Sequence, residues 1–267
     1  MSLSLSLSLS GLVASETNSI GLRTDSSRQS MDDVRKAGSH IKVYLPYLPY
    51  LAISHSVNAG FVRPANNERG WEYDMATAHR KIGDKIFEFD LRKGVRFQDG
   101  SKFNADSVVQ NLKYFKQKPY TYTAIDRVFD RAEKVSEYKV RVHLKEKYSL
   151  FIYDAMWIHF YTKEYLEKFG WNGKSTAPNL AAPGRYALGP YILKKGYVEG
   201  DRNSSVVELV ANDDYWDPRF PKVEKVTIFL DRKQDEAIFD VLEKEGEIDC
   251  QRTAHGCKFE CGPCVDQ

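Results

Sequence analysis

Apolar and charged residues alternate along several short segments in the middle of the chain. Residues 86–91 (IFEFDL) alternate strictly, and this period of two predicts a strand with one buried face. The Asp-Gly pair at 99–100 predicts a turn after a second short strand at 95–97. Residues 139–144 alternate in the same way, and residues 133–138 are expected to lead into them through a turn. These segments predict antiparallel pairs of strands.

Helical periodicity appears in fewer places. Asn104 occupies the N-cap position of a segment whose apolar residues over 108–115 recur at helical spacing. This pattern predicts an amphipathic helix of about eleven residues. A second amphipathic helix is expected over 235–245, where Gly246 marks its C-terminal end. Residues 149–169 are rich in aromatic side chains and also predict helix.

The remaining segments complete a mixed α/β pattern. An apolar, aromatic run at 41–53 predicts a strand in its first half only, because its two prolines are incompatible with a central strand. Residues 54–80 carry few periodic signals. No repeat of fixed period occurs, so the predicted fold class is mixed α/β with mostly antiparallel strands. Further strands are expected toward the C-terminus, at 191–193, 205–213, 222–231 and 247–249.

Composition and charge exclude two classes of function. The chain has 267 residues and a formal net charge of +2, with Lys and Arg interleaved among Asp and Glu throughout. Nucleic-acid binders usually concentrate basic residues in one stripe, so we expect no binding to nucleic acid. The sequence has no apolar stretch of about eighteen residues, so we do not expect an integral membrane protein. The length suits one large or two modest domains.

The two ends differ from the body of the chain in composition. The N-terminus repeats Ser-Leu, and residues 1–38 are expected to lie outside the fold, as a disordered tail or a degenerate export signal. With His255 nearby, the cysteines of the C-terminus have enough ligands for a tetrahedral zinc site; disulfides, or an unrelated tail, explain them equally. All the cysteines of the chain lie there: Cys250, Cys257, Cys261 and Cys264.

The chemistry of the residues favours binding over catalysis. The sequence contains no G-x-S-x-G elbow, phosphate-binding loop, H-E-x-x-H or G-x-G-x-x-G motif. Among the scattered histidines only His159 has an aromatic setting, where it either lines a pocket or packs as an ordinary histidine. Aromatic residues make up 13% of the chain and gather in a few clusters, which indicates a ligand cleft in addition to core packing.

An ordered series of motifs resembles one protein family. FEFDLRKGVRFQDGSKFNADSVVQNLKYF (87–115) resembles the signature of the family 5 solute-binding proteins, the peptide- and nickel-binding components of bacterial ABC importers. Segments 183–193, 209–231 and 237–249 resemble later motifs of this family in the same order. The short distance from the helix to TAIDRV at 123–128 favours the nickel-binding branch. The signature matches at Phe89, Leu91, Arg92, Gly94, Val95, Phe97, Asp99, Gly100, Ala105, Asp106 and Val108.

This resemblance implies a fold and a domain organisation. It implies a periplasmic-binding-protein-like lobe with an accessory subdomain, shortened to about the first half of a family member. The lobe is expected over 39–249, with the accessory subdomain at 54–175 and a return to the lobe at 176–249. Residues 1–38 form the N-terminal tail and residues 250–267 the Cys-rich tail.

The resemblance also implies a function without catalysis. A family member captures a small peptide or a nickel chelate, in the periplasm or outside the cell, and delivers it to an ABC permease in the membrane. The chain departs from the family because the Asp that pairs with the peptide amine, and the Arg of the nickel branch, match no residue here. The alternative is a shortened paralogue that acts as an interaction module, with zinc held by its cysteines. The expected ligand contacts are Tyr120, Tyr122, Trp157 and His159.

Overall fold

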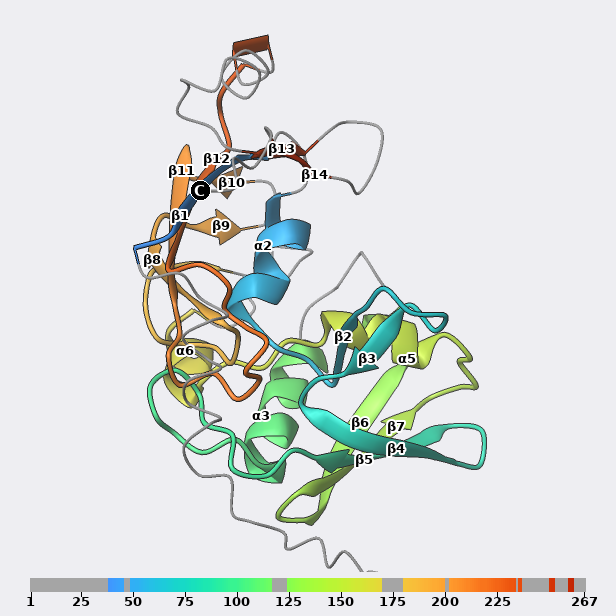
Figure 1. The fold of residues 1–267 in the computed structure, drawn as a ribbon. Helices are drawn as coiled ribbons and strands as arrows, with labels where there is room; N and C mark the ends of the chain where they lie inside the picture. Colours follow the sequence, from blue (N-terminus) through green and yellow to red (C-terminus); the bar gives the residue numbers. More distant parts are fainter. Residues whose placement is uncertain are drawn as a thin grey trace, which may run out of the picture.

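Two sheets, each with its own hydrophobic core, organise the protein (Figure 1). A computed structural model provides the coordinates. No helix in the part of the chain that it describes is long and apolar enough to cross a bilayer. The described residues are 38–45, 49–116, 124–169, 180–199, 202–233, 235–236, 250–252 and 259–261.

The first sheet has six strands in the order β14-β13-β1-β12-β11-β8. Strand β1 pairs in parallel with both β12 and β13, and the other neighbours are antiparallel. Helix α2 (Pro49–Val57) lies against this sheet, where Ile53 and Val57 pack with Val207, Leu209 and Ile228. The strand bounds are β1 His40–Tyr44, β8 Tyr191–Lys195, β11 Val206–Ala211, β12 Lys225–Phe229, β13 Cys250–Arg252 and β14 Phe259–Cys261.

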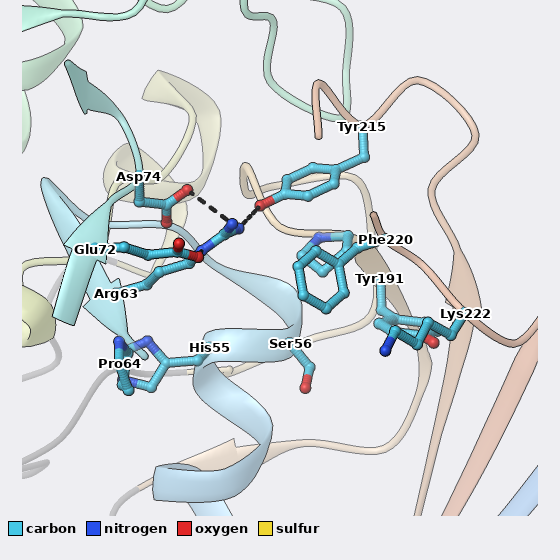
Figure 2. A pocket seen from close by; sticks show the side chains of 11 residues that line it. His55, Ser56, Arg63, Pro64, Glu72, Asp74, Tyr191, Tyr215, Phe220 and Lys222 are labelled. Atoms are coloured by element: carbon cyan, nitrogen blue, oxygen red, sulfur yellow. Dashed lines mark hydrogen bonds and ion pairs between the residues drawn. The ribbon is translucent and has the colours of Figure 1, made fainter. Parts of the chain in front are cut away.

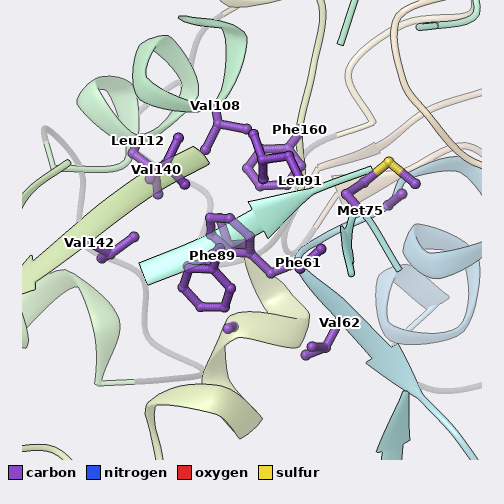
Figure 3. Packing of buried hydrophobic residues seen from close by; sticks show 14 of the residues in the cluster. Phe61, Val62, Met75, Phe89, Leu91, Val108, Leu112, Val140, Val142 and Phe160 are labelled. Carbon is purple, nitrogen blue, oxygen red and sulfur yellow. The ribbon is translucent and has the colours of Figure 1, made fainter. Parts of the chain in front are cut away.

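The second sheet is antiparallel throughout, in the order β4-β5-β7-β6. Its inner face packs on helix α3 (Ala105–Lys116), because Phe89 and Leu91 of β5 meet Val108 and Leu112 of the helix in one core (Figure 3). Phe61 stacks on Phe89 with ring centroids 4.1 Å apart. The strand bounds are β4 Ala76–Ile82, β5 Ile86–Leu91, β6 Phe129–Ser136 and β7 Lys139–Leu144.

Short elements connect and flank the two sheets. The hairpin of β2 and β3 leads from α2 into the second sheet, and a smaller hairpin of β9 and β10 follows β8. Thr162 caps α6, since its side chain accepts a hydrogen bond from the Tyr165 N–H at 3.2 Å. The bounds are β2 Val62–Pro64, β3 Trp71–Tyr73, β9 Val198–Glu199, β10 Arg202–Asn203, α4 Ile125–Val128, α5 Phe151–Asp154, the 3-10 helix η1 Ala155–Trp157 and α6 Lys163–Lys168.

The strand at 86–91 and the helix that follows it are confirmed. Asn104 accepts the N–H of Ser107 at 3.1 Å, as an N-cap does. Strand β7 buries alternate residues as its pattern predicts. The mixed α/β fold class is also confirmed, with strands mostly in antiparallel pairs.

Other predictions of secondary structure were wrong, held only in part or are not tested by the described residues. Residues 133–136 belong to strand β6, and only residues 137 and 138 form the turn. The strand at 95–97 is reduced to a single bridge between Arg96 and Lys102. Residues 149–169 form short helical turns around an extended stretch rather than one helix. Most of the predicted helix at 235–245 and the strand at 247–249 lie outside the described residues.

Helix α2 was missed altogether. It begins at Pro49, where proline is tolerated because the first helical N–H groups have no partner within a helix. The prolines that excluded a strand beyond β1 therefore also mark the start of a helix.

A buried glutamine joins the two sheets. The Nε2 of Gln98 donates to the carbonyl oxygens of Gly189 at 3.2 Å and Tyr191 at 2.8 Å, and its Oε1 accepts the Ala187 N–H at 3.4 Å. Gly189 approaches α2 so closely that a Cβ would lie 2.3 Å from the carbonyl carbon of Val57. The signature stretch thus carries a side chain that ties the turn after β5 to the start of β8.

Candidate functional site at the junction of the two sheets

Arg63 organises a network of charges where the β2–β3 hairpin meets the loop between β11 and β12. Its Nε donates to Glu72 at 2.7 Å, its Nη1 to the hydroxyl of Tyr215 at 3.1 Å and its Nη2 to Asp217 at 2.5 Å. Arg219 donates to the same two carboxylates. Burial alone would raise the pKa of Asp217, but the hydrogen bonds from Arg219 and Arg63 hold it well below its ordinary range.

Asp74 belongs to this network but is poorly compensated within it. It is 3% exposed, and its Oδ1 lies 3.9 Å from Nη1 of Arg63, beyond hydrogen-bonding distance. This oxygen accepts no hydrogen bond from the part of the chain that the structure describes. Burial raises the pKa of Asp74 to about 7, and the attraction of Arg63 only partly opposes that effect. The junction therefore contains a buried carboxyl group with an unsatisfied oxygen.

A cavity of about 400 Å³ opens beside this network. Asp74, Glu72 and Arg63 form one end of it, and Lys222 lies toward the opposite end (Figure 2). Its walls are mainly apolar and aromatic, from Pro64, Tyr191, Tyr215 and Phe220. Small-molecule sites commonly combine apolar walls with a few converging polar groups, and this cavity has that character.

His55 connects the cavity to a second cluster of rings. It lines the cavity, and its Nδ1 lies 3.4 Å from Nε2 of His159. The indole of Trp157 packs on His55 with ring centroids 4.7 Å apart. Burial lowers the pKa of His55 to about 4 and that of His159 further, so both imidazoles are neutral near pH 7. Neither His55 Nε2 nor His159 Nδ1 has a hydrogen-bond partner among the described residues.

Residues 70–254 match the profile of the bacterial extracellular solute-binding proteins, family 5 Middle. The chain belongs to this family. The resemblance drawn from the signature motifs is thereby confirmed, and the family consists of solute-binding proteins.

Curated relatives of this family 5 chain carry names that refer to peptides. The chain is 29% identical over 195 residues to the Di/tripeptide-binding protein 3 of Pseudomonas aeruginosa, over 64% of this chain and 34% of the relative. The Dipeptide-binding protein of another strain of that species matches to the same extent. The chain therefore spans about a third of the length of the curated relatives it matches.

Solved structures share the fold of the family 5 chain at lower identity. NikA from Brucella suis, in complex with Fe(III)-EDTA, superposes with a TM-score of 0.62 at 22% identity, over 79% of this chain and 43% of that one. The dipeptide binding protein from Pseudoalteromonas sp. SM9913, in complex with Met-Leu, gives 0.61 at 19% identity, over 79% and 46%. These likenesses place this chain in the fold of periplasmic binding proteins.

The structure brings together two of the four ligand contacts expected for the family 5 chain. Trp157 ends η1 and His159 follows two residues later, and both contact His55. His159 is only 1% exposed, so it is packed against the cavity-lining His55 and does not itself face open solvent. Tyr120 and Tyr122 lie outside the described residues. The assignment of ligand contacts stays a prediction.

The sequence analysis missed the residues that build the cavity. His55 and Asp74 fall in the region of weak periodicity, and Arg63 looks like any cation in a loop. No local signal identifies them, because key partners are more than a hundred residues away in the chain: His159 for His55 and Asp217 for Arg63.

The predicted zinc site of the Cys-rich tail stays a prediction. Cys250 and Cys261 are direct partners in the antiparallel pair of β13 and β14, at the edge of the six-stranded sheet. Cys257 and Cys264 lie outside the described residues. Among the residues whose side chains are described, no group of three His, Cys, Asp or Glu is arranged to hold a metal ion.

Proposed function

We propose that this chain is the ligand-binding lobe of a substrate-binding protein that serves an ABC importer. Its cargo would be a small peptide or a nickel chelate, taken up in the periplasm or outside the cell and delivered to a membrane permease. The observation that carries the proposal is the match of residues 70–254 to the family profile. The printed names of the relatives, with a dipeptide and a metal chelate among the ligands, support the two classes of cargo.

The proposed contacts lie on the ring cluster at His55. Trp157 supplies a flat apolar surface, and neutral imidazoles at His55 and His159 supply nitrogen atoms that donate or accept hydrogen bonds without the cost of burying a charge. Tyr120 and Tyr122 are proposed to complete the aromatic wall. Capture by closure of two lobes is proposed for a family member of full length, since this chain spans only part of its relatives.

Thermal unfolding against a panel of ligands tests the proposed function. The panel contains dipeptides, longer peptides, and nickel with and without histidine. A ligand that binds only the folded chain, present at a hundred times its Kd, adds about 2.7 kcal/mol of stability and raises the midpoint accordingly. We expect one class of the panel to produce this shift, and that class identifies the cargo.

Two variants and a control locate the contacts. We expect Trp157→Ala and His159→Asn to reduce the ligand-induced shift, because they remove the proposed stacking surface and one imidazole. Tyr153→Ala removes an exposed aromatic ring and should leave the shift unchanged. A cooperative transition that no member of the panel moves would contradict the proposed function for this chain.

A further inference from the structure

Two cysteines are paired at one edge of the six-stranded sheet, where β13 and β14 lie (Figure 1). Cys250 begins β13 and Cys261 ends β14, and the antiparallel register makes them direct partners. The Cα atoms of such partners lie about 4.5 or about 5.5 Å apart, according to the hydrogen-bonding pattern. Both values fall within the range of about 4.4–6.8 Å that disulfides span. The backbone therefore meets the distance requirement for a bridge between these two positions.

The two positions also share a face of the sheet with a hydrophobic core. Val43 of β1 pairs with Cys250 on one side and with Ile228 on the other, and Ile228 pairs with Val207. Because paired residues lie on the same face, one row of positions crosses five neighbouring strands from Val207 to Cys261. Val43, Ile228 and Val207 pack in the core to which α2 contributes. The register thus places both cysteines on the apolar face, where an uncharged disulfide is compatible and a thiolate would be costly.

We propose that Cys250 and Cys261 form a disulfide bridge that fastens β14, the last strand of the sheet, to β13. One S–S bond forms, and the two thiols give up two protons and two electrons. These reduce a disulfide oxidant, either glutathione disulfide or a dithiol–disulfide oxidoreductase, to two thiols. The bridge lies at the end of the strand pair away from Arg252 and Phe259, so it closes the pair into a covalent ring. A zinc site of all the cysteines needs both residues as thiolates, and the bridge excludes it.

Distance along the sequence favours other pairings. Cys250 and Cys261 are separated by eleven positions, whereas Cys257 is seven positions from Cys250 and four from Cys261. In an unfolded chain the entropic cost of closing a loop rises with its length, so the pairings through Cys257 are cheaper. A preference for the Cys250–Cys261 bridge therefore has to come from the sheet.

The bridge is independent of the proposed capture of a peptide or chelate. It requires only the register of β13 and β14 and an oxidant, and no ligand takes part. Disulfides persist in oxidising compartments such as the periplasm, so the bridge is compatible with the location proposed for the chain. Failure of either proposal leaves the other standing.

Peptide mapping of the full chain tests the bridge. The folded chain is equilibrated with reduced and oxidised glutathione, free thiols are blocked with N-ethylmaleimide, and the chain is then digested with trypsin. We expect mass spectrometry to find the peptide of Cys250 linked to the peptide of Cys261, and reduction to separate them. Cleavage after Lys and Arg divides the cysteines among three peptides: 245–252 with Cys250, 253–258 with Cys257, and 259–267 with Cys261 and Cys264.

Cysteine variants and urea identify the partner and the role of the fold. We expect Cys261→Ser to reduce the yield of this link about tenfold, whereas the matched controls Cys264→Ser and Cys257→Ser should leave it unchanged. In concentrated urea the yield from the unaltered chain should also fall about tenfold, because the sheet no longer holds Cys250 and Cys261 opposite each other. Free thiols at both residues of the folded chain, a main link through Cys257, or an undiminished link in Cys261→Ser or in urea would overturn the proposal.

Discussion

Glu88 on the four-stranded sheet and Asp74 at the junction are 2% and 3% exposed, but their surroundings shift their pKa values in opposite directions. Glu88 accepts hydrogen bonds from Arg80, Lys139 and Arg141, at 2.8, 3.3 and 2.7 Å. Burial alone would raise its pKa, but these bonds, led by Arg141, lower it. Asp74 lies in the interior with its Oδ1 unbonded, and burial raises its pKa to about 7.

The difference teaches how to separate a structural carboxylate from a candidate binding group. Glu88 is hidden only by the long side chains that lie over it on the sheet surface, and those side chains satisfy it. Asp74 is buried in the interior beside a cavity, and its Oδ1 accepts no hydrogen bond from the described residues. An ionisable group with a perturbed pKa in a cleft is a candidate for function. A cluster of charged side chains on a sheet that satisfy one another's hydrogen bonds has a structural role.

Substitution of Arg63, the central cation of the junction, should give the largest difference in stability between the two regions. We expect Arg63→Met to destabilise the protein by about 3–5 kcal/mol, because it takes from the buried Asp217 one of its two arginine partners and from the half-buried Glu72 its hydrogen bond at 2.7 Å. Arg80→Met at the Glu88 cluster should cost about 1 kcal/mol or less, since Arg80 is 65% exposed and two other cations remain. Chemical denaturation of both variants gives the comparison. Equal losses in the free energy of unfolding would mean that the two clusters contribute equally to stability.

Substitution of a glycine by alanine should likewise cost more stability at the junction than on the four-stranded sheet. We expect Gly189→Ala to cost about 3 kcal/mol, because its Cβ would meet the backbone of Val57 at 2.3 Å and neither segment can yield without breaking the junction. Gly83, in the turn between β4 and β5, has a φ of +62° and open space around it, so Gly83→Ala should cost only about 1 kcal/mol of backbone strain. Thermal unfolding of the two variants decides, and a harmless Gly189→Ala would show that the junction is loosely packed.

The two carboxylates should have opposite pH signatures. The folded pKa of Asp74 is raised from 3.8 to about 7, so the folded state binds more protons and stability falls as the pH rises through that window. Each unit of pKa difference corresponds to about 1.4 kcal/mol. Asp74→Asn has no carboxyl group to titrate at this position, so it does not lose this stability. Its free energy of unfolding, relative to that of the unaltered chain, should therefore increase between about pH 5 and about pH 8, on either side of the raised pKa.

Glu88→Gln provides the contrast. The folded pKa of Glu88 is lowered, so its contribution to stability is present above its ordinary pKa of 4.5 and is lost as the pH falls through the folded value. The deficit of Glu88→Gln should shrink in acid, and urea denaturation at several pH values measures both trends. A deficit of Glu88→Gln that is constant with pH would refute the role of its ion pairs.

A local cap should have the smallest effect. Asn104→Ala removes the hydrogen bond from the Ser107 N–H to the Asn104 side chain and should cost about 1 kcal/mol. The loss is expected to add to that of Arg63→Met without coupling, because the two sites share no partner. Denaturation of the double variant checks this, and a strong coupling would show that the two sheets are more tightly linked than their contacts imply.

The contrast between regions also explains which helices and strands could be predicted from the sequence. Strand 86–91 and the helix capped by Asn104 were predicted because each buries one face against its immediate neighbours, so their patterns are periodic. Helix α2 was missed because its hydrophobic pattern is weak, and because one proline precedes it and another is its first residue. Strand β6 was misjudged because residues 133–136 are largely polar and partly exposed, as on the edge strand of a sheet.

The candidate site was less readable than the fold. Trp157 and His159 stood out because aromatic neighbours surround them in sequence, and the structure places them together with His55. Arg63, Asp74 and Asp217 lie in three different segments, and nothing in any one of them marks a shared cavity.

By itself the sequence determined the family, the mixed α/β class and the local elements whose hydrophobic period, turn residues or cap residues act over a few positions. Only the tertiary structure decided which charged groups are satisfied. Hydrogen bonding and desolvation depend on partners brought together by the sheets, as when Arg63 reaches Asp217 across 154 positions of sequence while Asp74, eleven residues from Arg63, stays unbonded at its Oδ1. The chemistry of the junction is thus a property of the fold, because the free energy of a buried charge is set by what surrounds it in space.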